Sequence, residues 1–240
     1  MKAVILAAGI GSRLRPLTDN IPKCMIEVNG VKIIEKQLNN LIIGGIEKEN
    51  ILVLTGYLNK KLENYITENY AGVNIIYNEK YNQTNNMYSM YMTKDFLKNS
   101  DFLLMNADVF YDENVIKDLL KDNRKNLITC DNGFYLEESM KIRKENDRVI
   151  EIAKTISENN SYGSSIDVYK ISKEAGNELF YIMKDTIELK KNLNAWTEVA
   201  LNELLSKIEF NSLDIDYEWV EIDNYEDLKL AEEKFLGELK

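Results

Sequence analysis

The amino-acid sequence predicts an α/β protein with three layers, α/β/α, around a mixed and mostly parallel sheet. Two observations lead to this prediction. Short apolar runs recur along the first half of the 240-residue chain, and segments with apolar residues at helical spacing separate them. Beyond about residue 133 the pattern changes to short alternating strands. Strands that alternate with helices favour a sheet with helices on both faces.

The first half of the chain contains the most regular part of this pattern. We expect buried strands at residues 3–6, 51–54, 73–77, 102–105 and 127–130, and a short strand at 25–28 before the turn Asn29-Gly30. We expect amphipathic helices at residues 33–42, 58–70, 86–97 and 115–120. Gly44 and Gly45 are suited to end the first of these helices.

The second half begins with a β-rich insertion at about residues 133–170. Its expected strands are 133–136, 140–143, 149–152 and 162–169, with a hairpin turn at 145–147. After it we expect helices at 175–183, 197–205 and 225–239, and strands at 208–210 and 213–215. No linker, repeat or low-complexity tract interrupts the chain, so we interpret residues 1–240 as one domain with an embedded β subdomain.

The composition excludes several classes of function. The chain has no histidine, which excludes histidine acid/base catalysis, serine–histidine triads and the commonest zinc sites. A net charge of −10 offers no basic face to nucleic acid. No apolar run is long enough to span a membrane and the N-terminus lacks signal-peptide features. Two isolated cysteines, Cys24 and Cys130, also agree with a reducing cytoplasm, which is where we expect the protein.

The most informative stretch is LAAGIGSRLRPLTDNIPK, residues 6–23, directly after the first expected strand. Gly9 and Gly11 allow the backbone to approach a bulky anion and to direct its N–H groups at it. Arg13, Arg15 and Lys23 supply the positive charge that a triphosphate needs. The spacing is neither the dinucleotide fingerprint nor the Walker A loop, because the sixth-position glycine and the Gly-Lys-Ser/Thr sequence are missing.

This stretch resembles the signature G-x-G-x-R-L-x-P-L-T-x-x-x-P-K of nucleotidyltransferases, which join a nucleoside triphosphate to a phosphorylated small molecule and release pyrophosphate. The resemblance covers essentially the whole chain. It implies a Rossmann-like nucleotidyltransferase fold in which the insertion at about 133–170 forms the acceptor side.

The polar loop at residues 78–86 leads into a helix and has two interpretations. Thr84 and Asn85 would serve as ordinary capping residues, with Met87 and Met90 facing the core. The form N-x-K-Y…N-N-x-Y-S-x-Y instead resembles the phosphocholine cytidylyltransferase-like branch, where this connection reads the base, and it implies CTP as the donor. The expected nucleotide-binding residues are Leu6, Ala7, Ala8, Gly9, Gly11, Asn78, Thr84, Asn85, Asn86 and Ser89.

Two aspartates are the expected ligands of a catalytic Mg²⁺. Asp108 follows the strand at 102–105, and Asp223 belongs to the E-I-D element before the last helix. Each would also suit a turn or a helix cap. In the family that the chain resembles, the matching aspartates hold the metal. Mg²⁺ prefers a site of this kind, in which all ligand atoms are oxygens. Asn106, where many relatives have glycine or aspartate, stays unassigned.

The implied reaction is in-line attack of an acceptor phosphate oxygen on the α-phosphorus of CTP. Because that oxygen is already anionic, no general base is required. We expect Lys23 to act on the α-phosphate and the acceptor phosphate, and Arg13 on the leaving pyrophosphate.

The acceptor is the least constrained part of the prediction. The resemblance implies a small phosphorylated amine or amino-acid amide for cell-surface polysaccharide or capsule biosynthesis, with phosphoglutamine first and phosphocholine next. The expected acceptor residues are Glu198, Tyr135, Arg143 and Trp196, with Lys141 as a further possibility; Glu198 is alternatively a third acidic group at the metal. Tyr162 and Tyr169 join Tyr135 and Trp196 as candidates for an aromatic cage. A sugar-1-phosphate nucleotidyltransferase remains the alternative enzyme, a catalytically silent nucleotide sensor the alternative outside enzymes, and the oligomeric state is open.

Overall fold

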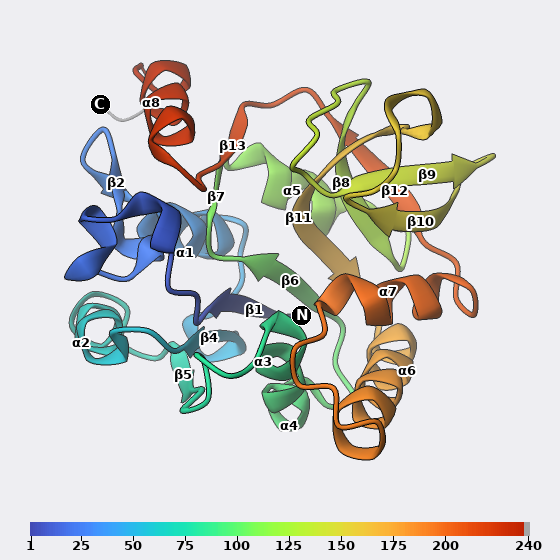
Figure 1. Cartoon of the computed structure of the whole chain (residues 1–240), viewed down its shortest axis with the longest axis horizontal. Helices are drawn as coiled ribbons and strands as arrows, with labels where there is room; N and C mark the ends of the chain where they lie inside the picture. Colours follow the sequence, from blue (N-terminus) through green and yellow to red (C-terminus); the bar gives the residue numbers. More distant parts are fainter. Residues whose placement is uncertain (238–240) are drawn as a thin grey trace.

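A nine-stranded sheet forms the centre of the molecule in the computed structural model, which describes residues 1–237 (Figure 1). In spatial order its strands are β5 (Asn74–Tyr77), β4 (Ile51–Thr55), β1 (Lys2–Ala7), β6 (Phe102–Asn106), β11 (Gly163–Ile171), β8 (Leu127–Asn132), β12 (Asn211–Ile215), β10 (Arg148–Ala153) and β9 (Lys141–Glu145). Two short ribbons pair β2 (Glu27–Val28) with β3 (Val31–Lys32), and β7 (Val109–Tyr111) with β13 (Trp219–Glu221).

The direction of the strands changes next to β6. Strands β5, β4, β1 and β6 are parallel, with Ile5 opposite Met105 and Leu6 opposite Asn106. Strand β11 runs antiparallel to both β6 and β8. The carboxyl ends of β1 and β6 therefore lie at the same edge of the sheet as the first half of β11.

Helices cover both faces of the sheet, as expected for the three-layer class (Figure 1). One face, which bears Val4 and Leu6, packs against α3 (Asn86–Met92), α4 (Lys94–Leu97), α6 (Lys173–Lys184) and α7 (Thr197–Leu205). The other, which bears Ala3 and Ile5, packs against α1 (Ile33–Ile43), α2 (Asn59–Asn69) and α5 (Asn114–Lys121). Adjacent residues of β1 face opposite layers because strand side chains alternate, so this strand is buried on both sides.

A third, smaller apolar cluster anchors the end of the chain beside the N-terminal loop. Helix α8 (Tyr225–Lys234) contributes Ala231, and Phe235 stacks edge-on against Phe110 of β7 with ring centroids 4.8 Å apart. Leu14 and Ile222 belong to the same cluster. The segment that carries Asp223 is therefore packed against the segment that carries Arg13.

Short helical turns complete the chain. The 3-10 turns are η1 (Ser12–Leu14), η2 (Leu17–Asp19), η3 (Lys23–Met25), η4 (Lys48–Asn50) and η5 (Glu158–Asn160), and η6 (Asp185–Leu189) is a π-helical turn that extends α6. No helix among residues 1–237 is long and apolar enough to cross a bilayer.

Several expected elements differ from the structure. Residues 133–136 are not a strand, because Gly133 adopts a left-handed φ of +79° where β8 has ended. Residues 208–210 are not a strand, and the strand expected at 213–215 is β12, which begins at Asn211. The helix expected at 86–97 is divided at Thr93 into α3 and α4, and β7 was not expected. Helix α8 ends at Lys234, and the part of the expected helix that reaches residue 239 lies outside the described residues.

A capping box begins α8, and we predict that it stabilises the C-terminal segment. Asn224 accepts a hydrogen bond from the backbone of Asp227, and the Asp227 carboxylate accepts bonds from the backbones of Asn224 and Asp223. Replacing Asn224 with alanine should lower the free energy of unfolding by about 1 kcal/mol. Urea denaturation measures this, with Lys229→Ala on the exposed face of α8 as a control expected to stay within about 0.5 kcal/mol. Equal losses in the two variants would contradict the prediction.

Candidate active site

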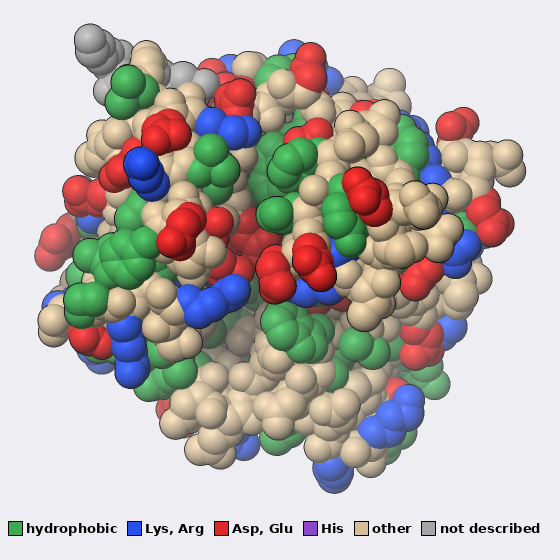
Figure 2. Space-filling view, turned by 45° about the horizontal axis from the view of Figure 1, so that its top comes forward, with side chains coloured by type: hydrophobic (Ala, Val, Ile, Leu, Met, Phe, Trp, Pro, Cys, Tyr) green, Lys and Arg blue, Asp and Glu red, His purple; other side chains and the backbone are tan. Residues whose placement is uncertain are grey.

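A cavity of about 270 Å³ opens where β1 and β6 end. Figure 2 shows the corresponding hollow near the centre of the face that it draws, with acidic side chains gathered around the hollow. Of the ten residues expected to bind the nucleotide, those that line the cavity are Leu6, Ala7, Ala8, Gly9, Thr84, Asn85, Asn86 and Ser89. Gly11 and Asn78 do not line the cavity. Gly11 lies against Lys23, and Asn78 donates hydrogen bonds to Thr84 and Ser89.

Glycines fix the path of the loop after β1. At Gly56 an added Cβ would lie 2.6 Å from the carbonyl oxygen of Ala8, so this position needs a glycine for β4 and the loop to meet. Gly11 has a left-handed φ of +65°, and a Cβ there would lie 2.9 Å from the Cβ of Lys23. Thr18 donates a 2.8 Å hydrogen bond to the Gly11 carbonyl. The loop therefore brings the Gly11 backbone directly against Lys23.

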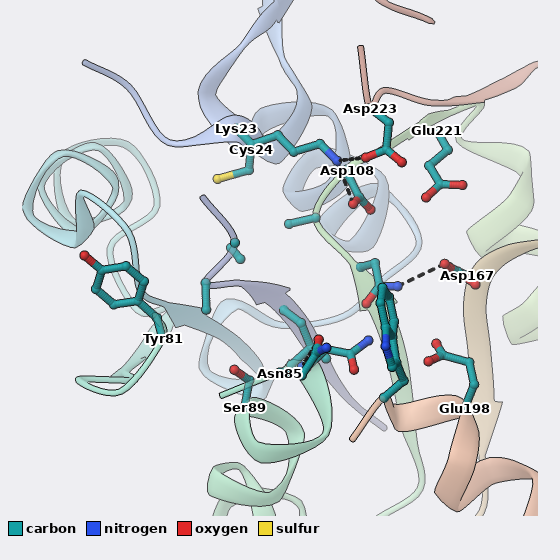
Figure 3. Close-up of a pocket in the computed structure, with 18 of the residues that line it drawn as sticks. Lys23, Cys24, Tyr81, Asn85, Ser89, Asp108, Asp167, Glu198, Glu221 and Asp223 are labelled. Carbon is teal, nitrogen blue, oxygen red and sulfur yellow. Dashed lines mark hydrogen bonds and ion pairs between the residues drawn. The ribbon is translucent and has the colours of Figure 1, made fainter. Parts of the chain in front are cut away.

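Lys23 joins both expected metal ligands in one ion-pair cluster. Its Nζ lies 2.9 Å from Asp108 Oδ2 and 2.5 Å from Asp223 Oδ1 (Figure 3). Arg13 Nη2 lies 2.5 Å from the other oxygen of Asp223. The Lys23 side chain is only 13% exposed, whereas that of Arg13 is 57% exposed. The structure thus brings together Lys23, Arg13, Asp108 and Asp223 from segments far apart in the sequence.

The electrostatics of the cluster follow from burial and from these pairs. Burial opposes the charge on Lys23, but the attraction of Asp108 and Asp223 outweighs it and raises the pKa of the ammonium group. Burial likewise opposes the charge on Asp223, but Lys23 and Arg13 lower the pKa of that carboxyl group. Both groups are therefore charged at neutral pH.

Glu221 adds a third carboxylate that the sequence analysis did not assign. Carboxylate oxygens of Asp108, Glu221 and Asp223 lie within 4.8 Å of one another. Burial, followed by repulsion from Asp108, Asp167 and Asp223, raises the pKa of Glu221 to about 9. Asp108 Oδ1 is buried without a hydrogen-bond partner among the described residues. An oxygen-only cluster with an unsatisfied carboxylate oxygen fits a hard divalent cation.

A hydrogen-bonded polar wall forms the side of the cavity that we expected to hold the base. Buried Asn78 donates bonds of 3.1 Å to Thr84 Oγ1 and to Ser89 Oγ. Asn85 caps α3, as the alternative interpretation of this loop expected, and it also lines the cavity. The amide oxygen of Asn86 accepts a 2.8 Å bond from the backbone of Thr197, which ties this wall to the start of α7.

The facing wall is acidic, with Asp167 and Glu198 below the metal-binding candidates in Figure 3. Glu198 and Trp196 were expected here, whereas Asp167 and Lys154 were not. Asp167 sits at a bulge in β11 with a φ of +56°, and neither feature leaves a local signal in the sequence. Lys154 follows β10 and resembles any surface lysine in sequence.

Other candidates from the sequence lie elsewhere. Arg143 pairs with Glu151 at 2.9 Å on the β9–β10 ribbon and does not line the cavity. Lys141 is buried, donates hydrogen bonds to the carbonyl groups of Leu136 and Glu137, and lies 5.1 Å from the centroid of the Tyr135 ring. Lys141 and Tyr135 therefore hold the loop after β8 and are not part of the cavity lining.

Comparison with known proteins gives one family. Residues 2–140 match the family described as Nucleotidyl transferase. The chain is 32% identical to the CTP:phosphoglutamine cytidylyltransferase of Campylobacter jejuni, over 98% of this chain and all of that protein. It is 39% identical to the choline-phosphate cytidylyltransferase of Streptococcus pneumoniae, over 57% of this chain and 58% of that one.

A solved structure agrees with this assignment. The crystallised CTP:phosphocholine cytidylyltransferase of Streptococcus pneumoniae superimposes with a TM-score of 0.79 and 26% identity, and the match covers 97% of each chain. The resemblance of the N-terminal stretch to nucleotidyltransferases and the expected Rossmann-like α/β class are thereby confirmed.

The buried acid Glu198 predicts a pH dependence of stability. Burial, followed by repulsion from Asp167, raises the pKa of Glu198 from 4.5 to about 7. Between these values the unfolded chain loses this proton before the folded one does, so stability falls as pH rises. Relative to Glu198→Gln, the free energy of unfolding of the wild type should fall by about 1–3 kcal/mol from pH 4.5 to pH 7.5.

Urea denaturation in metal-free buffer across this pH range tests the prediction. Glu203→Gln, on the exposed side of the same helix, is the matched control and should follow the wild type. A difference between wild type and Glu198→Gln that stays constant with pH would show that Glu198 titrates normally.

Proposed function

The chain belongs to the nucleotidyl transferase family, and on that premise we propose that it transfers CMP from CTP to the phosphate of a small phosphorylated amine or amino-acid amide, with release of pyrophosphate. One observation carries the proposal. The glycine loop with Arg13 and Lys23 opens onto the same cavity as the carboxylates of Asp108, Glu221 and Asp223. The cationic side chains suit a triphosphate and an acceptor phosphate, and the carboxylates suit a divalent cation.

The donor side of the cavity is suited to CTP. Cytosine presents both a hydrogen-bond donor and acceptors, and an amide side chain complements both kinds of group. Asn85 and Asn86 supply amides at the cavity wall, and Asn78 holds Thr84 and Ser89 in place behind them. The two cytidylyltransferases to which the chain is similar support CTP as the donor.

Catalysis by these residues consists of positioning and neutralisation of charge. Lys23 would act on the α-phosphate and on the entering acceptor phosphate, and Arg13 on the leaving pyrophosphate. Asp108, Glu221 and Asp223 would hold Mg²⁺, which as a Lewis acid would stabilise charge on the α-phosphate. The acceptor phosphate is itself an anion, so a chain without histidine needs no base for the attack.

Lys23 also has a counter-ion role. Its ammonium group lies between Asp108 and Asp223, so it compensates two carboxylates that would otherwise repel each other in a buried place. When the phosphates of CTP enter, the same ammonium group is within reach of a second set of anions. Lys23 thereby links the acidic cluster to the transferred phosphate.

A pyrophosphate-release assay tests the function. With Mg²⁺, all four nucleoside triphosphates and the acceptors phosphoglutamine, phosphocholine, phosphoethanolamine and glucose-1-phosphate, we expect release with CTP and an amine-bearing acceptor. Chelation of the metal should abolish it. Release only with UTP or dTTP and the sugar phosphate would replace the proposal by a sugar-1-phosphate nucleotidyltransferase, and no release under any condition would support the catalytically silent alternative.

The role of Lys23 gives a quantitative prediction. Lys23→Ala should lower kcat by about 10²–10³-fold, equivalent to about 3–4 kcal/mol, which is typical for the loss of one group that stabilises charge in the transition state. Lys32→Ala removes an ammonium group that pairs with Glu27 outside the cavity and should keep wild-type kinetics. Circular dichroism shows whether Lys23→Ala is folded, and normal turnover by a folded variant would exclude Lys23 from the chemistry.

A further inference from the structure

The acceptor half of the cavity carries charges that the chemistry of phosphate transfer does not need. Asp167 and Glu198 line the wall opposite Asn85 and Ser89, beyond the three carboxylates assigned to the metal (Figure 3). Lys154 and Trp196 line the same half. Two additional acids do not favour an acceptor phosphate, whereas they are suited to bind a cationic part of the acceptor.

Asn86 and the backbone of Glu198 itself supply hydrogen bonds to the Glu198 carboxyl group, but one of its oxygens lacks the partner that a buried carboxylate requires. The residue is only 5% exposed, and its Oε2 has no hydrogen-bond partner among the described residues. Buried acids are normally paired or hydrogen-bonded, because the uncompensated charge is costly. The side chain extends from the first turn of α7 into the cavity (Figure 3). Its position indicates a ligand that brings a donor.

Asp167 is held beside Glu198 by an unusual piece of backbone. Its φ of +56° places a non-glycine residue in the left-handed region in the middle of β11, at the irregularity between Ser165 and Tyr169. Asn106 donates to one carboxylate oxygen at 3.0 Å, and the Tyr169 hydroxyl group donates to the other at 2.7 Å. A strained residue with a fixed carboxylate is typical of a functional position.

The cavity lacks the aromatic cage that a quaternary ammonium group prefers. Among the described residues the aromatic side chains that line it are Tyr81, on the nucleotide side, and Trp196. Tyr169 uses its hydroxyl group on Asp167, and Tyr162 bonds to Asp214 and lies under Lys144. A trimethylammonium group has no N–H to donate, whereas a primary ammonium group has three. Two carboxylates with one aromatic ring therefore suit the primary ammonium group.

Lys154 supplies a cation on the same side. Its Nζ lies 5.7 Å from the centroid of the Trp196 ring, and it forms no ion pair within residues 1–237. Burial raises the pKa of Asp167 and of Glu198, and the positive charge of Lys154 opposes that rise in both carboxyl groups. Opposite charges thus meet in one small region of the cavity.

We propose that Asp167, Glu198 and Lys154 recognise the two head-group charges of a phosphorylated α-amino acid derivative: the two acids bind its primary ammonium group, and Lys154 binds its carboxylate. This inference rests on the proposed cytidylyl transfer and names the class of its acceptor. The ammonium and carboxylate groups of such a head group are bonded to the same carbon atom. The head group therefore carries a cation and an anion side by side, and two acids and a lysine line this half of the cavity. Phosphocholine, with one permanent cation and no carboxylate, would leave Lys154 without a partner.

The acceptor can be varied one charge at a time. We would compare phosphoglutamine with an analogue that lacks the α-carboxylate and with one that lacks the α-ammonium group, the phosphate staying at the same place. The wild type should use each analogue at least about 100-fold less efficiently in kcat/KM, because a buried polar group is left unpaired in each case. The KM for CTP should not change.

Variants identify which residue reads which charge. Glu198→Gln should raise the KM for phosphoglutamine about 10-fold or more, yet have little effect on the analogue without the ammonium group. Lys154→Met should show the complementary pattern, with little effect on the analogue without the carboxylate. Lys144→Met, whose ammonium group contacts Ser212 and the Tyr162 ring outside the cavity, is the control.

The outcomes separate this inference from the function on which it rests. No pyrophosphate release from CTP with any acceptor would overturn the proposed function itself. Efficient transfer to phosphocholine together with equal use of both analogues would leave cytidylyl transfer standing and overturn the zwitterion site. Equal losses for every acceptor in Glu198→Gln and Lys154→Met would also overturn it, and if a variant does not fold, the comparison of acceptors on the wild type decides.

Discussion

The ion-pair cluster of Lys23 with Asp108 and Asp223 is the interaction on which the rest of the site depends. It joins the N-terminal loop, the end of β6 and the segment before α8, three parts of the chain that approach one another only in the folded protein. Carboxylates this close together cannot all stay ionised in a buried place without a counter-ion. Lys23 supplies one, and burial followed by repulsion from Asp108, Asp167 and Asp223 still raises the pKa of Glu221. The folded chain therefore presents an acidic cluster that still favours a cation.

The strand order explains why the Lys23 cluster and the acidic wall with Asp167 lie at the same edge of the sheet. Strands β1 and β6 are parallel, so the glycine loop and Asp108 leave the sheet at one edge. Strand β11 is antiparallel to β6, so its first half, with Asp167, lies at that edge rather than its second half. Asn106 connects the two, because it is the last residue of β6 and its side chain donates a hydrogen bond to the Asp167 carboxylate. The unassigned asparagine of the sequence thus connects the metal side to the acceptor side.

The sequence predicted what local patterns encode and missed what register and bulges decide. The α/β class follows from the apolar runs and Asp108 from its place just after a buried strand, whereas the resemblance of residues 6–23 to the family signature indicated Lys23. Asp167 could not be found in this way, because neither the bulge in β11 nor the left-handed φ at Asp167 leaves a local signal in the sequence. Arg143 was a plausible anion ligand in sequence, but Glu151 on the neighbouring strand pairs with it. The strand expected at 133–136 was wrong because Gly133 ends the extended run.

Coupling between the two halves of the cavity is a consequence of its construction. Asn86 lies at the start of α3, on the nucleotide side, and its amide oxygen accepts the backbone N–H of Thr197 at the start of α7. The next residue is Glu198, so this bond joins the segment that we propose to read the base to the residue that we propose to bind the acceptor. In the reaction that we propose the attacking phosphate oxygen is already an anion, so catalysis relies on the placement of charges. An enzyme of this kind gains most when the two sides of its site are held in register, and the Asn86–Thr197 hydrogen bond joins the two walls of the cavity.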